Sequence, residues 1–393
     1  MNYVSRRFRF VVAFLMLAGL GGAPAAHGQD AAKYGADFLA GGVGARALGM
    51  GGAQVALTRN VNAGYWNASG LSNLDYPQGA YMHVERFAGV VSFDYGGVAM
   101  PITNESTVGL SFYRSGVNNI KNTLNAWNAE EGRPRANPEN YFSTFSAADY
   151  AFFVSYARRL SERLNVGVTG KVIRRVIGPF ANAWGYSFDV SAQYRLGRLV
   201  LGANIQDVST MLQSWSVNPE AYNNSIDQIN PDTGDPYTFE EMFAFESGGG
   251  GTLPAQLPQG GTFRVLPVAR LGSGYVLPIG EHSMTVGLDM DVAFNGQRAN
   301  VPNAGDVSFH PRLGTEFNYR GIVALRAGLK RVLYASDDYG FSVTPTVGAG
   351  LKLNQVNVNY GFGDFAGLSS DLGYSHRISV RLTLEQPGLQ RAE

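Results

Sequence analysis

The sequence predicts an all-β protein, a transmembrane antiparallel β-barrel of about 14 strands with an N-terminal plug segment. The first of three observations is a secretory leader at the N-terminus. The second is composition: 16% of the 393 residues are charged, 12% are aromatic and 50 are glycine, whereas soluble domains usually carry about 25% charged residues. The third is a set of strand-length segments in which apolar and polar residues alternate. Together they favour lipid-facing strands over the alternative, a soluble secreted all-β domain.

Residues 1–28 have the three parts of a cleavable signal peptide. Three arginines within residues 1–10 precede an apolar run of about a dozen residues, and small residues, Ala26 and Gly28, suit the −3 and −1 positions of cleavage. The mature chain would begin at Gln29. The run is shorter than the roughly 20 residues that span a bilayer, and no cysteine follows it to carry a lipid anchor. We therefore expect export, with the Gram-negative-type outer membrane as the destination.

The strand-length segments show a period of two. In residues 282–295, Val286, Leu288 and Met290 alternate with Thr285, Asp289 and Asp291. In a membrane barrel the apolar set faces lipid and the polar set faces the lumen. The predicted strands are 78–87, 89–101, 106–118, 148–158, 163–177, 184–196, 198–209, 263–278, 282–295, 306–319, 321–331, 340–353, 355–362 and 372–384.

Connection lengths support the barrel. Apart from a tight first hairpin, connections of a few residues alternate with longer ones, as short periplasmic turns and longer extracellular loops do in bacterial barrels. Residues 78–384 thus form the predicted outer-membrane barrel and residues 385–393 a periplasmic tail, with both termini in the periplasm.

The predicted lumen-facing positions carry charges of both signs. A filled lumen with salt bridges across it is one interpretation, because a charge away from bulk water needs a partner. A polar conduit is the other, although a mixture of signs argues against a single-sign ring that would select ions. The charged positions on which this rests include Lys171, Arg175, Asp189, Asp289, Asp291, Arg326 and Lys330.

The segment GVGARALGMGGAQVAL, residues 42–57, is rich in glycine, which indicates a backbone that approaches another group closely, with no side chains between them. Gly42, Gly44 and Ala47 fit a loose dinucleotide fingerprint, but that fingerprint works only after a buried strand, and the leader precedes it here. Glycines would instead let the segment pack closely against a barrel wall. Residues 29–77 are therefore predicted to be a plug inside the lumen.

Two motifs in the plug segment resemble the N-terminal signature of the PorV/PorQ family of outer-membrane proteins. Gly44–Ala53 match its first element, and Tyr65–Leu71 match its second except that Ala68 and Ser69 stand where Pro-Ala is usual. That family is similar to the FadL long-chain fatty-acid transporters, which are fourteen-stranded barrels with an N-terminal plug. The plug-motif residues carried over are Gly44, Arg46, Gly49, Gly51, Gly52, Trp66, Asn67 and Gly70.

The resemblance implies a role in a type IX-like secretion system. PorV-like proteins bind exported cargo and PorQ-like proteins anchor a surface partner, so the expected partners are secreted cargo proteins or surface-attachment machinery, together with outer-membrane lipid. The alternative is a FadL-like transporter of long-chain fatty acids or other hydrophobic small molecules. Equal numbers of basic and acidic residues, 31 each, give no global field that would attract nucleic acid.

An outer-membrane enzyme is a third class with little support. The five histidines lack metal-pair spacing, and the Gly-x-Ser-x-Gly motif of hydrolases does not occur. Asp289 and Asp291 share one strand face and would suit an acid–base pair, but a lumenal ion pair is the commoner arrangement. We predict no catalytic residue, metal or cofactor.

The segment from Thr210 to Thr262 is the predicted partner- or ligand-binding loop. Its large apolar residues would either form a small core of their own or an exposed patch for a partner or an acyl chain. Asp232 and Asp235 flank a turn that offers oxygens to Ca²⁺, but a full site needs about six ligands, which favours an ordinary turn. The candidate binding residues are Met211, Leu212, Trp215, Tyr237, Phe239, Met242, Phe243 and Phe245.

Overall fold

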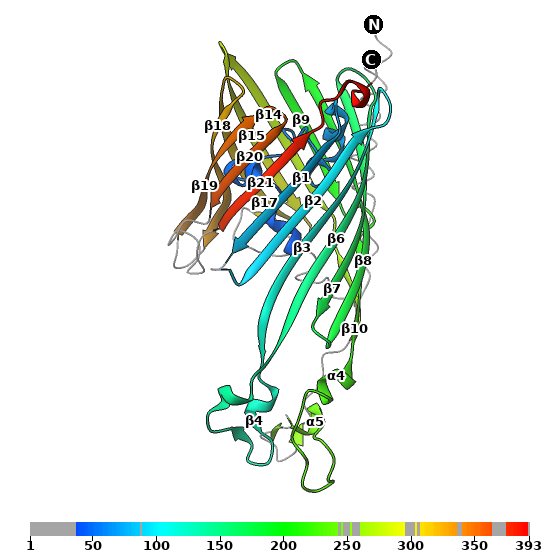
Figure 1. Cartoon of the computed structure of the whole chain (residues 1–393), viewed down its shortest axis with the longest axis vertical. Coiled ribbons are helices and arrows are strands. Elements are labelled where there is room, and N and C mark those ends of the chain that lie inside the picture. The colour runs from blue at the N-terminus through cyan, green and yellow to red at the C-terminus, as the bar shows by residue number, and fades with distance from the viewer. Residues whose placement is uncertain are drawn as a thin grey trace.

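A closed antiparallel barrel of fourteen wall strands forms the body of the protein in the computed structural model, as predicted (Figure 1). The structure describes residues 37–86, 89–242, 245–246, 252–253, 260–294, 303–304, 307–335, 340–363 and 375–391. Pairing of the first strand with the last, from Gln78 with Thr383 to Glu85 with His376, closes the wall. The predicted leader lies outside the described residues, and among those residues no helix is long and apolar enough to cross a membrane.

The wall strands follow the predicted order. Two of the fourteen are interrupted, so that β9 continues as β10 and β13 continues as β14. The strands are β1 (Gln78–Arg86), β2 (Val91–Pro101), β3 (Ser106–Asn122), β6 (Ser143–Arg159), β7 (Leu164–Ile177), β8 (Ala181–Leu196), β9 (Leu199–Gln206), β10 (Met211–Val217), β13 (Gly261–Val265), β14 (Val268–Ile279), β15 (His282–Ala293), β17 (Val307–Tyr319), β18 (Val323–Ala335), β19 (Gly340–Leu353), β20 (Val356–Gly363) and β21 (Ser375–Thr383).

Short elements fill the connections and the lumen. The lumenal segment contains η1 (Asp37–Gly41), α2 (Ala45–Gly49), α3 (Ala63–Trp66) and η2 (Ala68–Asn73). The others are η3 (Leu124–Ala126), β4 (Trp127–Asn128), β5 (Arg133–Pro134), η4 (Pro138–Tyr141), α4 (Pro219–Asn223), α5 (Phe239–Met242), β11 (Phe245–Glu246), β12 (Thr252–Leu253), β16 (Asn303–Ala304) and η5 (Pro387–Leu389).

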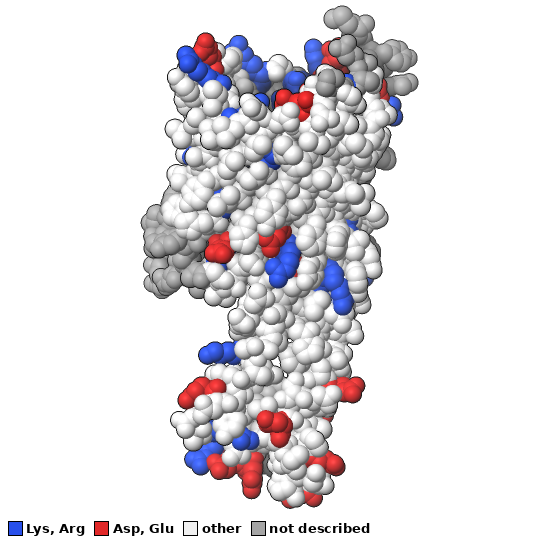
Figure 2. Space-filling model, in the orientation of Figure 1, with Lys and Arg blue, Asp and Glu red and all other residues white. Residues whose placement is uncertain are grey.

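The outer surface of the barrel is apolar. Side chains such as Val98, Leu110, Val154 and Phe188 point outward and are more than half exposed, which is costly in water over so large an area and favourable in lipid. Figure 2 shows charged atoms at one rim, in a group about halfway down the molecule and at the opposite end, with few on the broad white band between the rim and the middle group. This band is the membrane-facing surface.

The two ends of the barrel differ. Connections of two to four residues, such as 197–198 and 280–281, lie at one end, where the Leu384 amide also donates to the Pro77 carbonyl at 2.9 Å. The long connections lie at the other end (Figure 1), together with two short ones, the tight first hairpin and residues 178–180, where a longer loop was predicted. By the usual asymmetry of bacterial barrels, we assign the short-turn end to the periplasmic side.

The lumen is filled by residues 37–77, which we call the plug. Its backbone lies directly against glycines of the inner wall: a Cβ on Gly328 would lie 2.2 Å from the Gly51 amide nitrogen, and one on Gly314 would lie 2.3 Å from the Met50 carbonyl oxygen. Gly51 itself has φ of 63°, a conformation that glycine adopts without strain. Further plug contacts of this kind are made by Gly167, Gly202, Gly272 and Gly361.

The seventh wall strand is kinked, which corrects the predicted strand 198–209 and the predicted loop 210–262. β9 ends at Gln206, Asp207 and Thr210 have φ near 55°, and β10 then resumes the wall. Val190 of β8 pairs with Ile205 of β9, but Tyr186 of β8 pairs with Leu212 of β10. An advance of four residues along β8 therefore lies opposite an advance of seven residues from β9 to β10. The extra residues break the alternation of apolar and polar residues, so the pattern in the sequence ends at the kink although the wall continues beyond it.

A buried ion cluster holds the kink. Lys171 Nζ lies 2.8 Å from Asp189 Oδ1 and 2.6 Å from Asp207 Oδ1. The Asp207 amide donates to Asp189 Oδ1 at 2.9 Å, and Ser187 donates to Asp207 at 2.6 Å. Since both carboxylates and the ammonium are buried, each needs the others as partners.

We predict that Gly328→Ala displaces the plug. The new methyl group would overlap the Gly51 backbone, and overpacking of this kind costs about 1–3 kcal/mol or more. The measurement is the temperature at which the folded, fast-migrating band is lost on unboiled gels, together with protease sensitivity of the plug. Gly170→Ala is the matched control, because a Cβ at Gly170 meets nothing within 4 Å; equal behaviour of the two variants would contradict the prediction.

We also predict that Lys171→Met destabilises the barrel by about 3–5 kcal/mol, because it leaves two buried carboxylates without their cation. The same gel assay should show folded-band loss at a lower temperature. A triple variant that adds Asp189→Asn and Asp207→Asn removes the stranded charges and should recover much of the loss. A triple variant less stable than Lys171→Met alone would refute the charge-pairing explanation.

Candidate functional site

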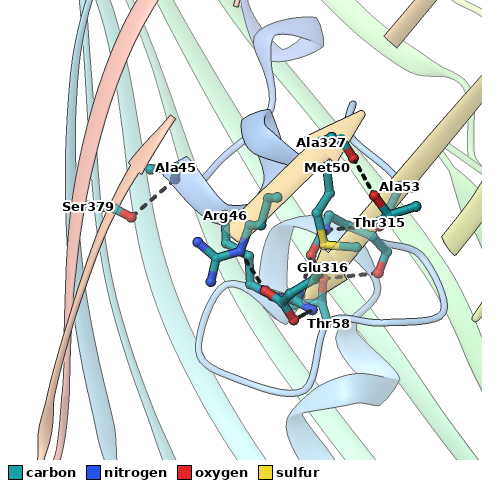
Figure 3. A network of polar contacts seen from close by, with 11 residues as sticks. Ala45, Arg46, Met50, Ala53, Thr58, Thr315, Glu316, Ala327 and Ser379 are labelled. Atoms are coloured by element: carbon teal, nitrogen blue, oxygen red, sulfur yellow. Dashed lines mark hydrogen bonds and ion pairs between the residues drawn. The ribbon is translucent and has the colours of Figure 1, made fainter. Parts of the chain in front are cut away.

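The plug is anchored to the wall by the residues of its glycine-rich motif. Gly44 precedes α2, which presents Arg46 to Glu316 of β17 through two hydrogen bonds of 2.8 and 2.9 Å. Figure 3 shows this contact beside the bond from the Ala45 amide to Ser379 of β21, 3.1 Å long. The motif therefore ties the plug to both β17 and β21.

The second motif ties the plug to itself and to β8. Trp66 Nε1 donates to the Val43 carbonyl at 2.9 Å, and Asn67 Nδ2 donates to the carbonyls of Val55 and Ala192 at 2.8 and 3.1 Å. Gly70 sits so close to Thr58 that a Cβ would lie 2.1 Å from its carbonyl oxygen. Gly49 and Gly52 also lie in the plug, Gly49 against Gly348 of β19 and Gly52 beside Arg312.

Most predicted lumen-facing charges are in ion pairs or bind the plug. Asp289 Oδ2 accepts from the amides of Gln54 and Val55 at 2.6 and 2.8 Å. Asp291 pairs with Arg312 and lies 3.5 Å from Arg270. Of the remaining positions, Lys171 and Asp189 lie in the kink cluster, Arg175 pairs with Asp149 at 2.7 Å, and Arg326 pairs with Glu316. Lys330 is half-buried and lies on the same face of β18 as Arg326 and Gly328.

Toward the long-loop end, plug and wall form an apolar layer inside the lumen. Tyr65 packs edge-on against Trp66 at 5.1 Å and against Phe153 at 6.0 Å, and stacks on Tyr113 at 6.4 Å. The layer was not foreseen, because the lumen was expected to be polar. It consists of Phe38, Val43, Ala47, Tyr65, Trp66, Met82, Val84, Phe93, Tyr95, Tyr113, Ala151, Phe153, Ile173 and Met211.

The apolar layer has a partly exposed rim. Leu39, Val91 and Val265 pack against the layer while remaining partly buried. Arg175 lies over the rings of Phe38 and Trp215 at 5.7 and 5.3 Å. The rim is therefore the place where the apolar interior meets the extracellular end of the lumen.

The candidate loop residues divide between the wall and a projection. Met211 is buried in the apolar layer, Leu212 points outward and Trp215 lies on β10, so these three are wall residues and not loop residues. Phe239 meets Tyr222 edge-on at 5.7 Å, Met242 is buried, and Tyr237 is half-buried. Nothing is described for Phe243, and Phe245 lies in the short β11.

The projection consists of two long connections, residues 123–142 and 218–242, raised on the extended ends of β3, β6, β8 and β10 (Figure 1). Asn125 Nδ2 donates to the Ser225 carbonyl at 2.9 Å, and Gln228 Nε2 donates to the Trp127 carbonyl at 2.8 Å. The apolar loop residues thus serve a small core shared by two connections. Sequence reasoning missed connection 123–142 as a partner, because cross-loop bonds leave no periodic signal.

The projection is acidic. Its two connections contain nine acidic residues and two arginines, and red atoms predominate at its tip in Figure 2. Among them Glu131 pairs with Arg133 at 2.6 Å. The excess of exposed carboxylates gives the tip a negative field that would attract a basic surface.

Toward the short-turn end, the lumen holds a polar cavity of about 290 Å³ between the plug and β1, β17, β18, β20 and β21. Its charged lining residues are Arg46, Arg59, Arg326, Arg381 and Glu316. Burial, followed by the neighbouring cations Arg195 and Arg46, lowers the pKa of Arg59 to about 10, so Arg59 remains charged at neutral pH. Arg59 and Arg381 were not among the predicted site residues; only the polar phase of the last strand pointed to Arg381.

No family model matches the chain, and no curated protein matches its sequence. Solved structures do share its fold. The toluene transporter TodX of Pseudomonas putida aligns with a TM-score of 0.53 at 14% identity, covering 88% of this chain and 99% of TodX. The CymD monoaromatic hydrocarbon channel aligns with a TM-score of 0.52 at 11% identity, covering 88% and 98%. The toluene transporter TbuX of Ralstonia pickettii aligns with a TM-score of 0.50 at 10% identity, covering 88% of this chain and 99% of TbuX. The chain is therefore a plugged fourteen-stranded barrel similar in fold to outer-membrane hydrocarbon transporters.

Proposed function

We propose that this barrel takes up hydrophobic small molecules, such as monoaromatic hydrocarbons or long-chain fatty acids, from the extracellular side. The observation that carries the proposal is the apolar, aromatic layer inside the lumen. A purely structural plug contact has no need of a partly exposed apolar rim, whereas a hydrophobic solute gains free energy by leaving water for such a surface.

The fold relatives support the same function. TodX and TbuX are toluene transporters and CymD is a monoaromatic hydrocarbon channel, and each aligns over nearly its whole length. Aromatic side chains suit aromatic solutes, because ring pairs gain about 0.5–1.5 kcal/mol beyond area burial. The aromatic residues Tyr65, Tyr113 and Phe153 at the centre of the layer would offer such contacts.

The test is uptake of radiolabelled toluene and oleate by cells that express the protein in their outer membrane. Leu39→Asp places a charge on the rim and should reduce uptake about tenfold, since burying a polar group against an apolar solute costs roughly 1–3 kcal/mol. Ala40→Asp is the matched control, because Ala40 is exposed beside the rim. Uptake that is equal in Leu39→Asp, Ala40→Asp and cells without the protein would refute the transport function.

The projection favours a second function, docking of a protein partner. Two loops that pack on each other and extend beyond the wall form an exposed platform, and the excess of carboxylates on it suits a partner with a basic face. We propose that the partner is an exported protein or a component of surface-attachment machinery of a type IX-like system, in line with the PorV/PorQ resemblance of the plug motifs.

Removal of residues 219–260 tests the docking function. Trp215 and Gly261 are already paired across β10 and β13, so a short turn can join the two strands and the barrel should still assemble. We expect proteins that co-purify with the full chain from native outer membranes to be lost, as scored by mass spectrometry, while toluene uptake is retained.

The control for the deletion neutralises charge at the opposite end, with Glu105→Gln and Glu281→Gln. Both residues lie on short turns and form exposed pairs with Arg158 and Arg320. This control should keep all partners. Unchanged partners after the deletion would exclude the projection as the docking surface.

A further inference from the structure

The polar cavity at the short-turn end differs in chemistry from the apolar layer on which the proposed uptake rests. It lies near the strand ends at the periplasmic side, since Arg381 pairs with Ala80, two residues from the start of β1. Five asparagines and Ser379 contribute to its lining beside the arginines. Such a lining offers mainly hydrogen bonds and charge, so a hydrocarbon would gain little by entering.

Positive charge in the cavity is not balanced by the protein. Four arginines line it against one carboxylate, Glu316, which both Arg46 and Arg326 already share. Among the residues that the structure describes, no carboxylate lies within 4 Å of the guanidinium of Arg59 or of Arg381. Three positive charges are therefore left without a counter-charge.

Individual donors in the cavity also lack acceptors. Nη1 of Arg326 and Nε of Arg381 are buried nitrogen atoms without a hydrogen-bond partner among the described residues. Arg326 itself is only 8% exposed. Buried polar groups are almost always satisfied, and an unsatisfied donor points to a bound ion or water.

A neighbouring pocket is cationic as well. A second pocket of about 260 Å³ at the same end shares Arg59 and is lined by Arg159, Arg163 and Arg195 with Glu162 as its acidic residue. Arg195 and Arg159 donate to neutral oxygens of the plug, Asn73 Oδ1 at 3.2 Å and the Ser72 carbonyl at 3.1 Å. These clustered guanidinium groups give the periplasmic face of the plug a positive field that attracts anions.

We propose that the polar cavity binds a phosphoryl oxyanion from the periplasmic side, with Arg59, Arg326 and Arg381 as its guanidinium donors. Guanidinium groups pair with phosphate oxygens through two parallel hydrogen bonds. A dianion with several acceptor oxygens matches the excess charge and the asparagine amides better than a monoanion such as acetate. The source is either a soluble phosphate compound or the headgroup of a phospholipid.

Equilibrium dialysis of the purified full-length protein in a phosphate-free, uncharged detergent tests the proposal. The probes are radiolabelled inorganic phosphate, short-chain dihexanoyl phosphatidic acid and acetate. We expect saturable phosphate binding that Arg381→Gln and Arg59→Gln each weaken by about 10- to 100-fold, the range for hydrogen bonds to charged groups. Arg320→Gln is the matched control, because Arg320 lies at the same end but pairs with Glu281 on an exposed turn at 2.8 Å.

Each outcome decides one point. Phosphatidic acid that binds at least tenfold more tightly than phosphate assigns the site to a lipid headgroup, and equal or weaker binding assigns it to a soluble phosphate compound. Absence of saturable binding of both probes at millimolar concentration, or equal weakening by Arg320→Gln, overturns the proposal. Acetate that competes as well as phosphate overturns the phosphoryl assignment.

Folding and transport are scored separately. Each variant is checked for the folded band on unboiled gels, and because Arg59 belongs to the plug and Arg381 to the wall, failure of one variant to fold leaves the other as a test. Hydrocarbon uptake does not enter the readout, so loss of phosphate binding and loss of transport are distinguishable results.

Discussion

The close approach of the plug backbone to glycines of the barrel wall is the constraint on which the rest of the structure depends. At Gly314 and Gly328 no side chain larger than hydrogen fits between wall and plug. Only this spacing brings the plug amides of Gln54 and Val55 to Asp289 and carries Arg46 to Glu316. Glycine in these strands lowers β-propensity, and the plug contacts offset that loss. Contacts between plug and wall therefore account for many of the glycines in the described strands.

Periodicity and connection length were sufficient to predict the barrel, because the period of two is a local property set by lipid on one side. The kink between β9 and β10 was not predictable in this way, since it depends on Lys171 of a different strand holding Asp207. The projection was missed for a related reason: the hydrogen bond from Asn125 to Ser225 joins residues 100 positions apart. Charged lumenal positions such as Asp189 and Arg326 were found by phase alone, but their partners required the structure.

The plug contacts two wall regions of different chemistry. Tyr113, Phe153 and Ile173 face it from the wall on the extracellular side, where they form an apolar layer. Arg326 and Arg381 face it on the periplasmic side. The sequence predicted one polar lumen because alternation shows only which side of a strand faces inward. Whether an inward residue meets water, an ion or the plug depends on its height along the barrel, and a phase argument carries no information on height.

The apolar layer and the projection share strands. β3 and β6 contribute Tyr113 and Phe153 to the layer and continue beyond it to connection 123–142, and β10 begins with Met211 in the layer and ends at the other connection. The kink separates this outer part of the wall from β9, so that β10 pairs with β8 in a register of its own. A partner at the projection would therefore contact strands that also contribute residues to the apolar layer. The two proposed functions, uptake at the apolar layer and docking at the projection, would therefore depend on one set of hydrogen-bonded strands.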